Sequence, residues 1–203
     1  LPPLPYTERD LQIAKERGEM LVLRPEDMLV GGRMVPLTLI GLRELFRKDP
    51  LGKLKAVIYS SSTKTGTDMW YSYQKFATEP IVGGRKQIRL GWYLVKKEVL
   101  NGSLYISWNN QQFLLKQYED GLRAEGAKNV SVMRRTALEA VYDVLLYYVN
   151  TGEKLLANVY DWTLTPESNG NLVYVGIFIA NGLHISSKPP EYPNPLTGVC
   201  PSR

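Results

Sequence analysis

The sequence contains very few of the side chains that form disulfides or bind transition metals. Among its 203 residues there is one cysteine, Cys200, and one histidine, His184. A single cysteine excludes an internal disulfide and a thiolate zinc cluster, and a single histidine excludes a site built from several imidazoles. These two counts remove most metalloenzymes and most cysteine–histidine catalysts. We therefore expect no cofactor.

Long hydrophobic runs are also absent. No apolar run approaches the roughly 20 residues that cross a bilayer, and no segment has the charged and apolar regions of a signal peptide. The composition is 44% hydrophobic and 22% charged, which is typical of a globular protein. The length suits one domain with a proper core, or a domain with a smaller appendage. No membrane span is predicted.

The charge balance is moderately basic, with a net charge of +5 and a pI of about 9.2. Such a balance permits nucleic-acid binding without requiring it, and scattered basic residues usually form solvated faces. Trp92 and Tyr93 add a weak pattern of aromatic residues beside the basic ones. A nucleic-acid-binding module is therefore kept as an alternative, although the sequence favours no nucleic-acid partner. It would place these residues on one face: Arg85, Lys86, Arg89, Lys96 and Lys97.

No motif in the sequence meets the requirements of a known catalytic site. The loop SSSTKTGTD (60–68) contains both S-x-x-K and K-T-G, but one lysine, Lys64, would have to serve in both motifs. In serine penicillin-recognising enzymes those motifs use different lysines on different elements. The pairs Gly31-Gly32 and Gly83-Gly84 do not lie between a strand and a helix, as a dinucleotide site requires. We expect no enzyme, and an enzyme of unrecognised type is the remaining alternative.

Periodicity and capping signals predict a mixed order of helices and strands. Thr7 and Asp10 begin a short helix that stops at Gly18. Thr38 begins a second helix, and Asn109 or Asn110 a third that runs to about Glu125. Ser131 is predicted to begin the strongest helix, which Gly152 ends. Strands are predicted over 20–24, 54–60 and 88–99, with a loop over 60–84.

The stretch VYVGIFIANGLHIS (173–186) is predicted to form a β-hairpin around an Asn-Gly pair. Its first strand is unusual because neither face is polar. Alternation places Val173 and Val175 on one face and Tyr174 and Gly176 on the other. A bulge at Gly176 would interrupt this alternation and change sides, so Val173, Val175 and Phe178 are assigned to the scaffold. The other face therefore requires either a cover or a ligand.

From residue 88 onward the predicted order is a strand, two helices and strands to the C-terminus. This order resembles the C-type lectin fold. TGEKLLANVYDWT (151–163) and YVGIF…LTGVCPSR resemble the formylglycine-generating-enzyme branch, whose closing pattern has an apolar-Gly-Gly-x-aromatic strand followed by a Gly-Phe-Arg-type strand. That enzyme works through paired cysteines, which this chain lacks. Pro193-Asn194-Pro195 also lacks the acidic ligand of calcium-dependent lectins, so neither activity is carried over.

The chain is more similar to the variable proteins of diversity-generating retroelements, which are non-catalytic members of this fold. Those systems mutate adenines in asparagine-type codons that end in a pyrimidine, and such codons cannot specify Lys, Glu, Gln, Met or Trp. Residues 168–187 contain none of these five, and only Lys188 and Glu191 depart from the pattern before the C-terminus. The resemblance implies ligand binding through a diversified surface on the terminal sheet.

The sequence thus predicts an α+β protein with a C-type-lectin-like ligand-binding domain over residues 86–203. Residues 1–85 would form an N-terminal elaboration that packs on this domain or precedes it. The expected function is receptor or surface recognition, with an unknown protein or surface ligand and a location on a virion or cell surface. The oligomeric state is left open. The candidate contacts are side chains of the hairpin and the segment after it: Tyr174, Ile177, Ile179, Ala180, Asn181, His184, Ser186, Ser187, Tyr192 and Asn194.

Overall fold

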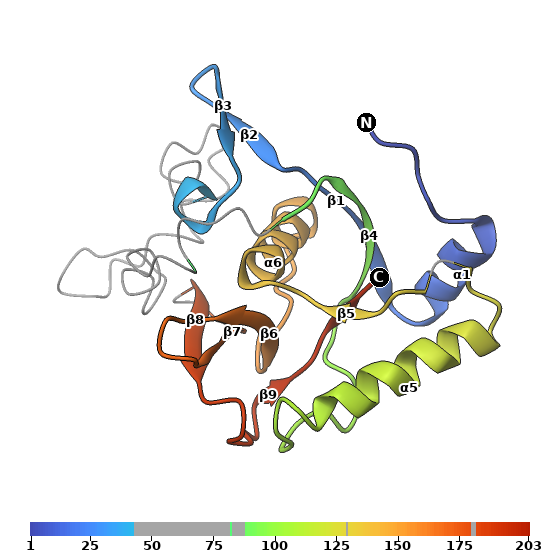
Figure 1. The fold of residues 1–203 in the computed structure, drawn as a ribbon. Coiled ribbons are helices and arrows are strands. Elements are labelled where there is room, and N and C mark those ends of the chain that lie inside the picture. The colour runs from blue at the N-terminus through green and yellow to red at the C-terminus, as the bar shows by residue number, and fades with distance from the viewer. Residues whose placement is uncertain (43–81, 83–87, 129, 180–181) are drawn as a thin grey trace.

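The computed structural model describes residues 1–42, 82, 88–128, 130–179 and 182–203. The chain is a mixed α+β protein in which helix α6 lies between two sheets (Figure 1). The helices that lie wholly within the described residues are α1 (Glu8–Glu16), α5 (Gln111–Ala124) and α6 (Ala137–Thr151), and residues 39–42 are also helical. The longer strands are β1 (Glu19–Arg24), β4 (Gly91–Lys96), β6 (Tyr160–Pro166), β7 (Leu172–Ile179) and β8 (Gly182–Lys188). The shorter strands are β2 (Asp27–Val30), β3 (Arg33–Pro36), β5 (Met133–Arg134), β9 (Thr197–Gly198) and β10 (Pro201–Ser202).

The first sheet joins the two ends of the described chain. Its strand order is β1-β4-β10-β5, and all its pairs are antiparallel. The order places the N-terminal strand β1 beside β4, the strand that precedes α5. Beyond β10, Leu94 and Arg203 exchange two backbone hydrogen bonds of 2.9 Å. Strand β1 is therefore integral to a sheet built mainly from the C-terminal part of the chain. Strands β2 and β3 form a separate hairpin.

The second sheet has the order β8-β7-β6-β9, with only the β6–β9 pair parallel. Alternate residues of β7 face α6, and Val173 and Val175 are fully buried in the main hydrophobic cluster. Helix α6 supplies Val141, Val144 and Leu145 to the same cluster. These contacts hold the sheet against the helix on one face and leave the opposite face of β7 and β8 turned away from the core.

The predicted bulge is present in β7. The register between β7 and β8 shifts between Gly176 and Ile179, and Ile177 has a left-handed φ of 47°. A Cβ atom on Gly176 would lie 2.1 Å from the carbonyl oxygen of Val159, so only glycine fits at this crossing. The bulge returns Phe178 to the core, where it is buried.

Several sequence predictions are confirmed by the structure. Helix α1 begins with a Thr7–Asp10 capping box, and α6 ends at Gly152 with a left-handed φ of 77°. The predicted strand over 88–99 is shorter, as β4 spans Gly91–Lys96. Residues 43–48 of the second predicted helix, the strand over 54–60 and most of the loop over 60–84 lie outside the described residues.

One predicted helix start is wrong. Ser131 does not begin the long helix, because Met133–Arg134 form β5 and the carbonyl oxygen of Arg135 accepts from Leu164. The backbone of these residues is thus committed to the sheets, and α6 begins after Thr136, which forms a capping box with Glu139. The predicted bounds of α5 are confirmed, with Asn110 as the N-cap residue, although its backbone is already helical and its side chain makes no capping bond.

Candidate ligand-binding surface

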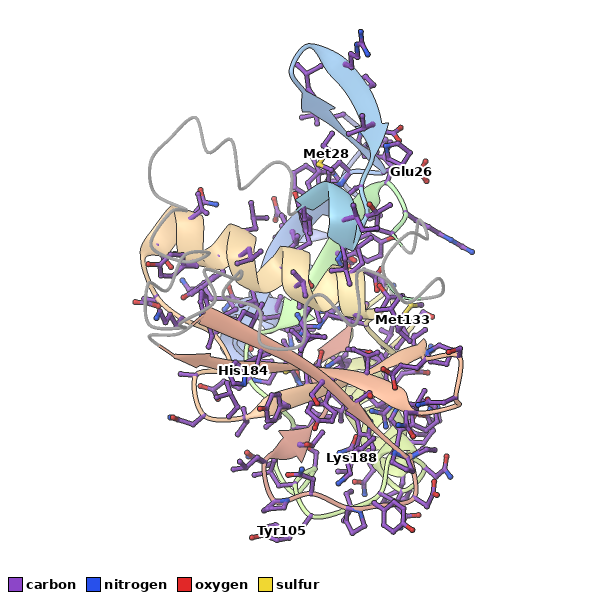
Figure 2. All side chains as sticks on the ribbon, turned by 90° about the vertical axis from the view of Figure 1, so that its left-hand side faces the viewer. Glu26, Met28, Tyr105, Met133, His184 and Lys188 are labelled. Carbon is purple, nitrogen blue, oxygen red and sulfur yellow. The ribbon has the colours of Figure 1, made fainter. Side chains whose placement is uncertain are left out.

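On the face of the second sheet that points away from α6, strand pairing places five partly exposed side chains and the fully buried Trp162, which lies opposite Tyr174. In the register, Gly176 lies opposite both Tyr160 and His184, and Tyr174 lies opposite Ser186. Leu172 lies opposite Lys188 in the same alternation. Because side chains at paired positions share a face, this set is called the outer face here: Tyr160, Tyr174, His184, Ser186 and Lys188. All five are partly exposed, and Figure 2 shows His184 and Lys188 along β8.

The outer face carries aromatic and neutral hydrogen-bonding groups. The rings of Tyr160 and Tyr174 meet edge to face, with centroids 4.7 Å apart. Burial raises the pKa of Tyr160 and lowers the pKa of His184 below 6.5, so the phenol and the imidazole are both uncharged at pH 7. Lys188 supplies the one formal charge of this set, and its Nζ lies 3.4 Å from the carbonyl oxygen of Pro193. The face can therefore supply aromatic contact area and hydrogen bonds.

The structure separates the other candidate contacts. Ser187 lies opposite Val173 on the face toward the core, and its hydroxyl donates to Glu167 at 2.6 Å. Ile177 is partly exposed at the bulge. Tyr192 is exposed and Asn194 is partly exposed, both in the segment after β8. The side chain of Ile179 and the residues Ala180 and Asn181 lie outside the described part of the chain.

A loop before α5 adjoins the segment that contains Tyr192 and Asn194. The backbone amide of Tyr105 donates to the carbonyl oxygen of Asn194 at 3.1 Å, and that of Trp108 donates to Pro190 at 2.9 Å. Tyr105 is 70% exposed and has a left-handed φ of 62°, and Figure 2 shows it at the end of the molecule away from α6. Sequence reasoning missed Tyr105 and Tyr160. The pairing of β6 with β7 could have suggested Tyr160, whereas nothing local in the sequence marks Tyr105.

Two described basic residues of the alternative nucleic-acid site, Lys96 and Lys97, do not share a face. Lys96 donates to the carbonyl oxygen of Arg17, whereas Lys97 lies over the ring of Tyr147 on α6. Neighbouring residues around the end of β4 thus direct their charges toward different elements, as strand alternation requires. Arg85 and Lys86 lie outside the described residues, and Arg89 is exposed before β4.

A cleft of about 430 Å³ lies between α5 and the segment that follows β4. It is lined by the polar groups of Arg17, Lys96, Glu98, Asn101, Gln117 and Tyr118, over an apolar floor of Val99, Leu100 and Leu114. Tyr118 donates to Glu19 at 2.7 Å, and burial raises its pKa, so this phenol stays protonated. Arg17 is held by Glu125 at 2.6 Å. Arg17 and Tyr118 thus pair with carboxylates that do not line the cleft.

Comparisons with known proteins add no relative. No protein-family model matches the chain, and neither a curated protein nor a solved structure matches it. Within the described residues, no group of three or more His, Cys, Asp or Glu side chains is placed to hold a metal ion. The helices of the same residues include none with the length and apolar character needed to span a membrane.

Proposed function

We propose that this chain is a non-catalytic binding protein whose outer face, with the adjoining segment 189–196, contacts a protein or surface ligand. The observation that carries the proposal is the division of β7 and β8 into two sets of side chains. Val173, Val175 and Ile185 are buried toward α6, while Tyr174, His184 and Ser186 alternate with them and stay accessible. A rigid scaffold that presents Tyr, His and Ser suits recognition, because such residues combine aromatic area with adaptable hydrogen bonds.

The fold we propose for residues 86–203 is C-type-lectin-like. The support is the order of elements: β4 precedes α5 and α6, and the strands β6 to β10 follow to the end of the chain. The predicted resemblance requires this order. It also requires that one face of the terminal sheet pack on helical core residues, as the face with Val173 does.

We further propose that the outer face, apart from Lys188, is diversified by a retroelement. The support is that Tyr174, His184 and Ser186 are residue types that pyrimidine-ending codons encode, within a segment free of Lys, Glu, Gln, Met and Trp. Half-exposed strand positions tolerate substitution, with surface changes usually within about 0.5 kcal/mol of neutral. Such a face can vary without loss of the core.

Deep sequencing of the locus in many cells or virions tests this proposal. We expect substitutions between codons 157 and 195 at pyrimidine-ending codons, with a near-copy template and a reverse transcriptase gene nearby. Variation should concentrate at Tyr174, His184 and Ser186. The interleaved codons of Val173 and Val175 are the matched controls and should stay constant, because their side chains fill the core. An invariant segment, or equal variation at both sets, would refute diversification of the outer face.

The alternative function, nucleic-acid binding, is tested separately from diversification. If the protein instead binds nucleic acid, affinity for a random-sequence duplex should fall steeply as salt rises. We expect no such binding at physiological salt. Salt-dependent binding that is lost when Lys96 and Lys97 are replaced would favour the alternative function.

A further inference from the structure

The bulge in β7 holds an isoleucine in a backbone conformation that isoleucine disfavours. Ile177 has a φ of 47°, in the left-handed region. A β-branched side chain at such a φ crowds its own backbone and is a genuine outlier. Glycine tolerates this region, and so do asparagine and aspartate, whose short polar side chains can hydrogen-bond locally. Isoleucine at this position therefore costs stability relative to any of these three residues.

The surrounding structure imposes the conformation of Ile177. Its amide donates to the carbonyl oxygen of Val159 at 3.0 Å, and the amide of Phe178 donates to that of Leu156 at 3.1 Å. Phe178 is buried in the main hydrophobic cluster. Before it in the chain, Gly176 occupies a crossing that admits no Cβ atom. Because both neighbours are fixed in this way, the backbone at position 177 keeps its strained φ whatever side chain it carries.

Packing in the core does not explain the isoleucine. Leu156 also has a left-handed φ, of 55°, but its side chain is buried in the main hydrophobic cluster, and that burial offsets the strain. Ile177 is partly exposed and belongs to none of the hydrophobic clusters of the described residues. Its neighbour Gly176 lies between Tyr160 and His184 in the register, so Ile177 adjoins the outer face. Strain without compensating burial is typical of functional positions.

We propose that Ile177 is itself a diversified residue of the ligand-binding surface, and that the template codon at its position specifies asparagine. The inference rests on the retroelement diversification proposed above. An asparagine codon that ends in a pyrimidine becomes an isoleucine codon when its second adenine is replaced by thymine. The same change in an aspartate codon gives valine, and a pyrimidine-ending glycine codon has no adenine to replace. Of the three residues that the left-handed backbone accepts, only asparagine therefore leads to isoleucine.

The nucleotide sequence of the locus provides the first test. Codon 177 should end in a pyrimidine, and the matching codon of the template should be AAT or AAC. Among many copies of the locus codon 177 should vary. The codons of Gly176 and Phe178 are the matched controls and should stay constant, because one residue admits no Cβ atom and the other fills the core. An ATA codon at 177, or a template codon for another residue, would overturn the inference.

Thermal unfolding of the full chain tests the backbone argument without reference to a retroelement. Ile177→Asn should raise Tm by about 2–4 °C, the shift expected when one left-handed residue is relieved of strain in a chain of this length. Ile177→Val is the matched control, because it keeps a β-branched side chain at the same φ. The control should leave Tm nearly unchanged. A Tm for Ile177→Asn at or below that of the unsubstituted protein would overturn the inference.

The sequencing outcomes separate this inference from the proposed function. Variation at Tyr174, His184 and Ser186 with a constant codon 177 would overturn the inference and leave the diversified surface in place. An invariant locus would overturn diversification, and the inference with it. Variation at codon 177 around an asparagine template, together with the higher Tm of Ile177→Asn, is the result that we expect.

Discussion

Replacement of Asp161 by asparagine should cost more stability than any comparable change on the surface. Asp161 Oδ2 accepts from Arg135 Nε at 2.9 Å and lies 2.8 Å from Arg135 Nη2, while Oδ1 accepts from the amide of Cys200 at 2.8 Å. Arg135 and Asp161 are each 1% exposed. The variant keeps the shape of the side chain and can keep the bond to Cys200. It removes the charge that neutralises Arg135 and turns an amide donor toward the guanidinium.

The loss of stability in this variant depends on the carboxylate partner that Arg135 keeps. Its remaining carboxylate is Asp143, at 3.1 Å, which also balances Arg24. Breaking a buried pair in this way costs about 3–5 kcal/mol, a large share of the roughly 5–15 kcal/mol that stabilises a typical domain. Equilibrium unfolding in urea, with the slope m compared to confirm a two-state transition, measures the loss.

Asp120→Asn provides the control for this experiment. Asp120 pairs with Lys116 at 2.8 Å, but both side chains are more than half exposed, and such solvent-screened pairs contribute little to stability. If Asp161→Asn loses no more stability than Asp120→Asn, the buried ion pairs contribute little and the reasoning is wrong.

Three further predictions concern the sheet and its neighbouring loop. Gly176→Ala should destabilise the protein by more than 2 kcal/mol in urea unfolding, about the cost of a severe steric change, because its Cβ would meet the carbonyl oxygen of Val159; a loss below about 0.5 kcal/mol would contradict the close crossing. Tyr105→Gly should raise the free energy of unfolding by up to about 1 kcal/mol, since glycine accepts the left-handed φ of 62° and little buried area is lost; a lower Tm would count against this. In an NMR titration, the single histidine, His184, should show a midpoint below 6.5 because burial lowers its pKa. The unfolded chain then binds the His184 proton more readily than the folded protein does. The contribution of His184 to the free energy of unfolding is therefore present above about pH 6.5 and declines as the pH falls toward the folded-state pKa. A midpoint above 6.5 would disprove the assigned cause.

Local signals in the sequence were sufficient for elements that local chemistry controls. The Thr7–Asp10 capping box and the alternation of Val173 and Val175 both act within a few residues, and both are confirmed. The start of α6 was misplaced because the competing interaction is distant. Arg134 is held in a strand by Pro201, 67 positions away along the printed sequence, and no local pattern shows that pairing.

The candidate site also contains some residues that the sequence could group and others that it could not. Alternation was enough to group Tyr174 with other outward positions of the hairpin, and the register places His184 and Ser186 with it. The contact of Tyr105 with Asn194 joins two loops about 90 residues apart, and only the folded chain brings them together.

The buried ion pairs also have a consequence for how the protein folds. Arg24 of β1 contacts Asp143 on α6, and Asp143 and Asp161 of β6 both contact Arg135, so the charges run from one sheet through the helix to the other. A partly folded chain with one sheet docked would bury an arginine beside too few carboxylates. Such intermediates are penalised, and both sheets should therefore detach from α6 in a single cooperative transition. The network makes the two sheets one folding unit.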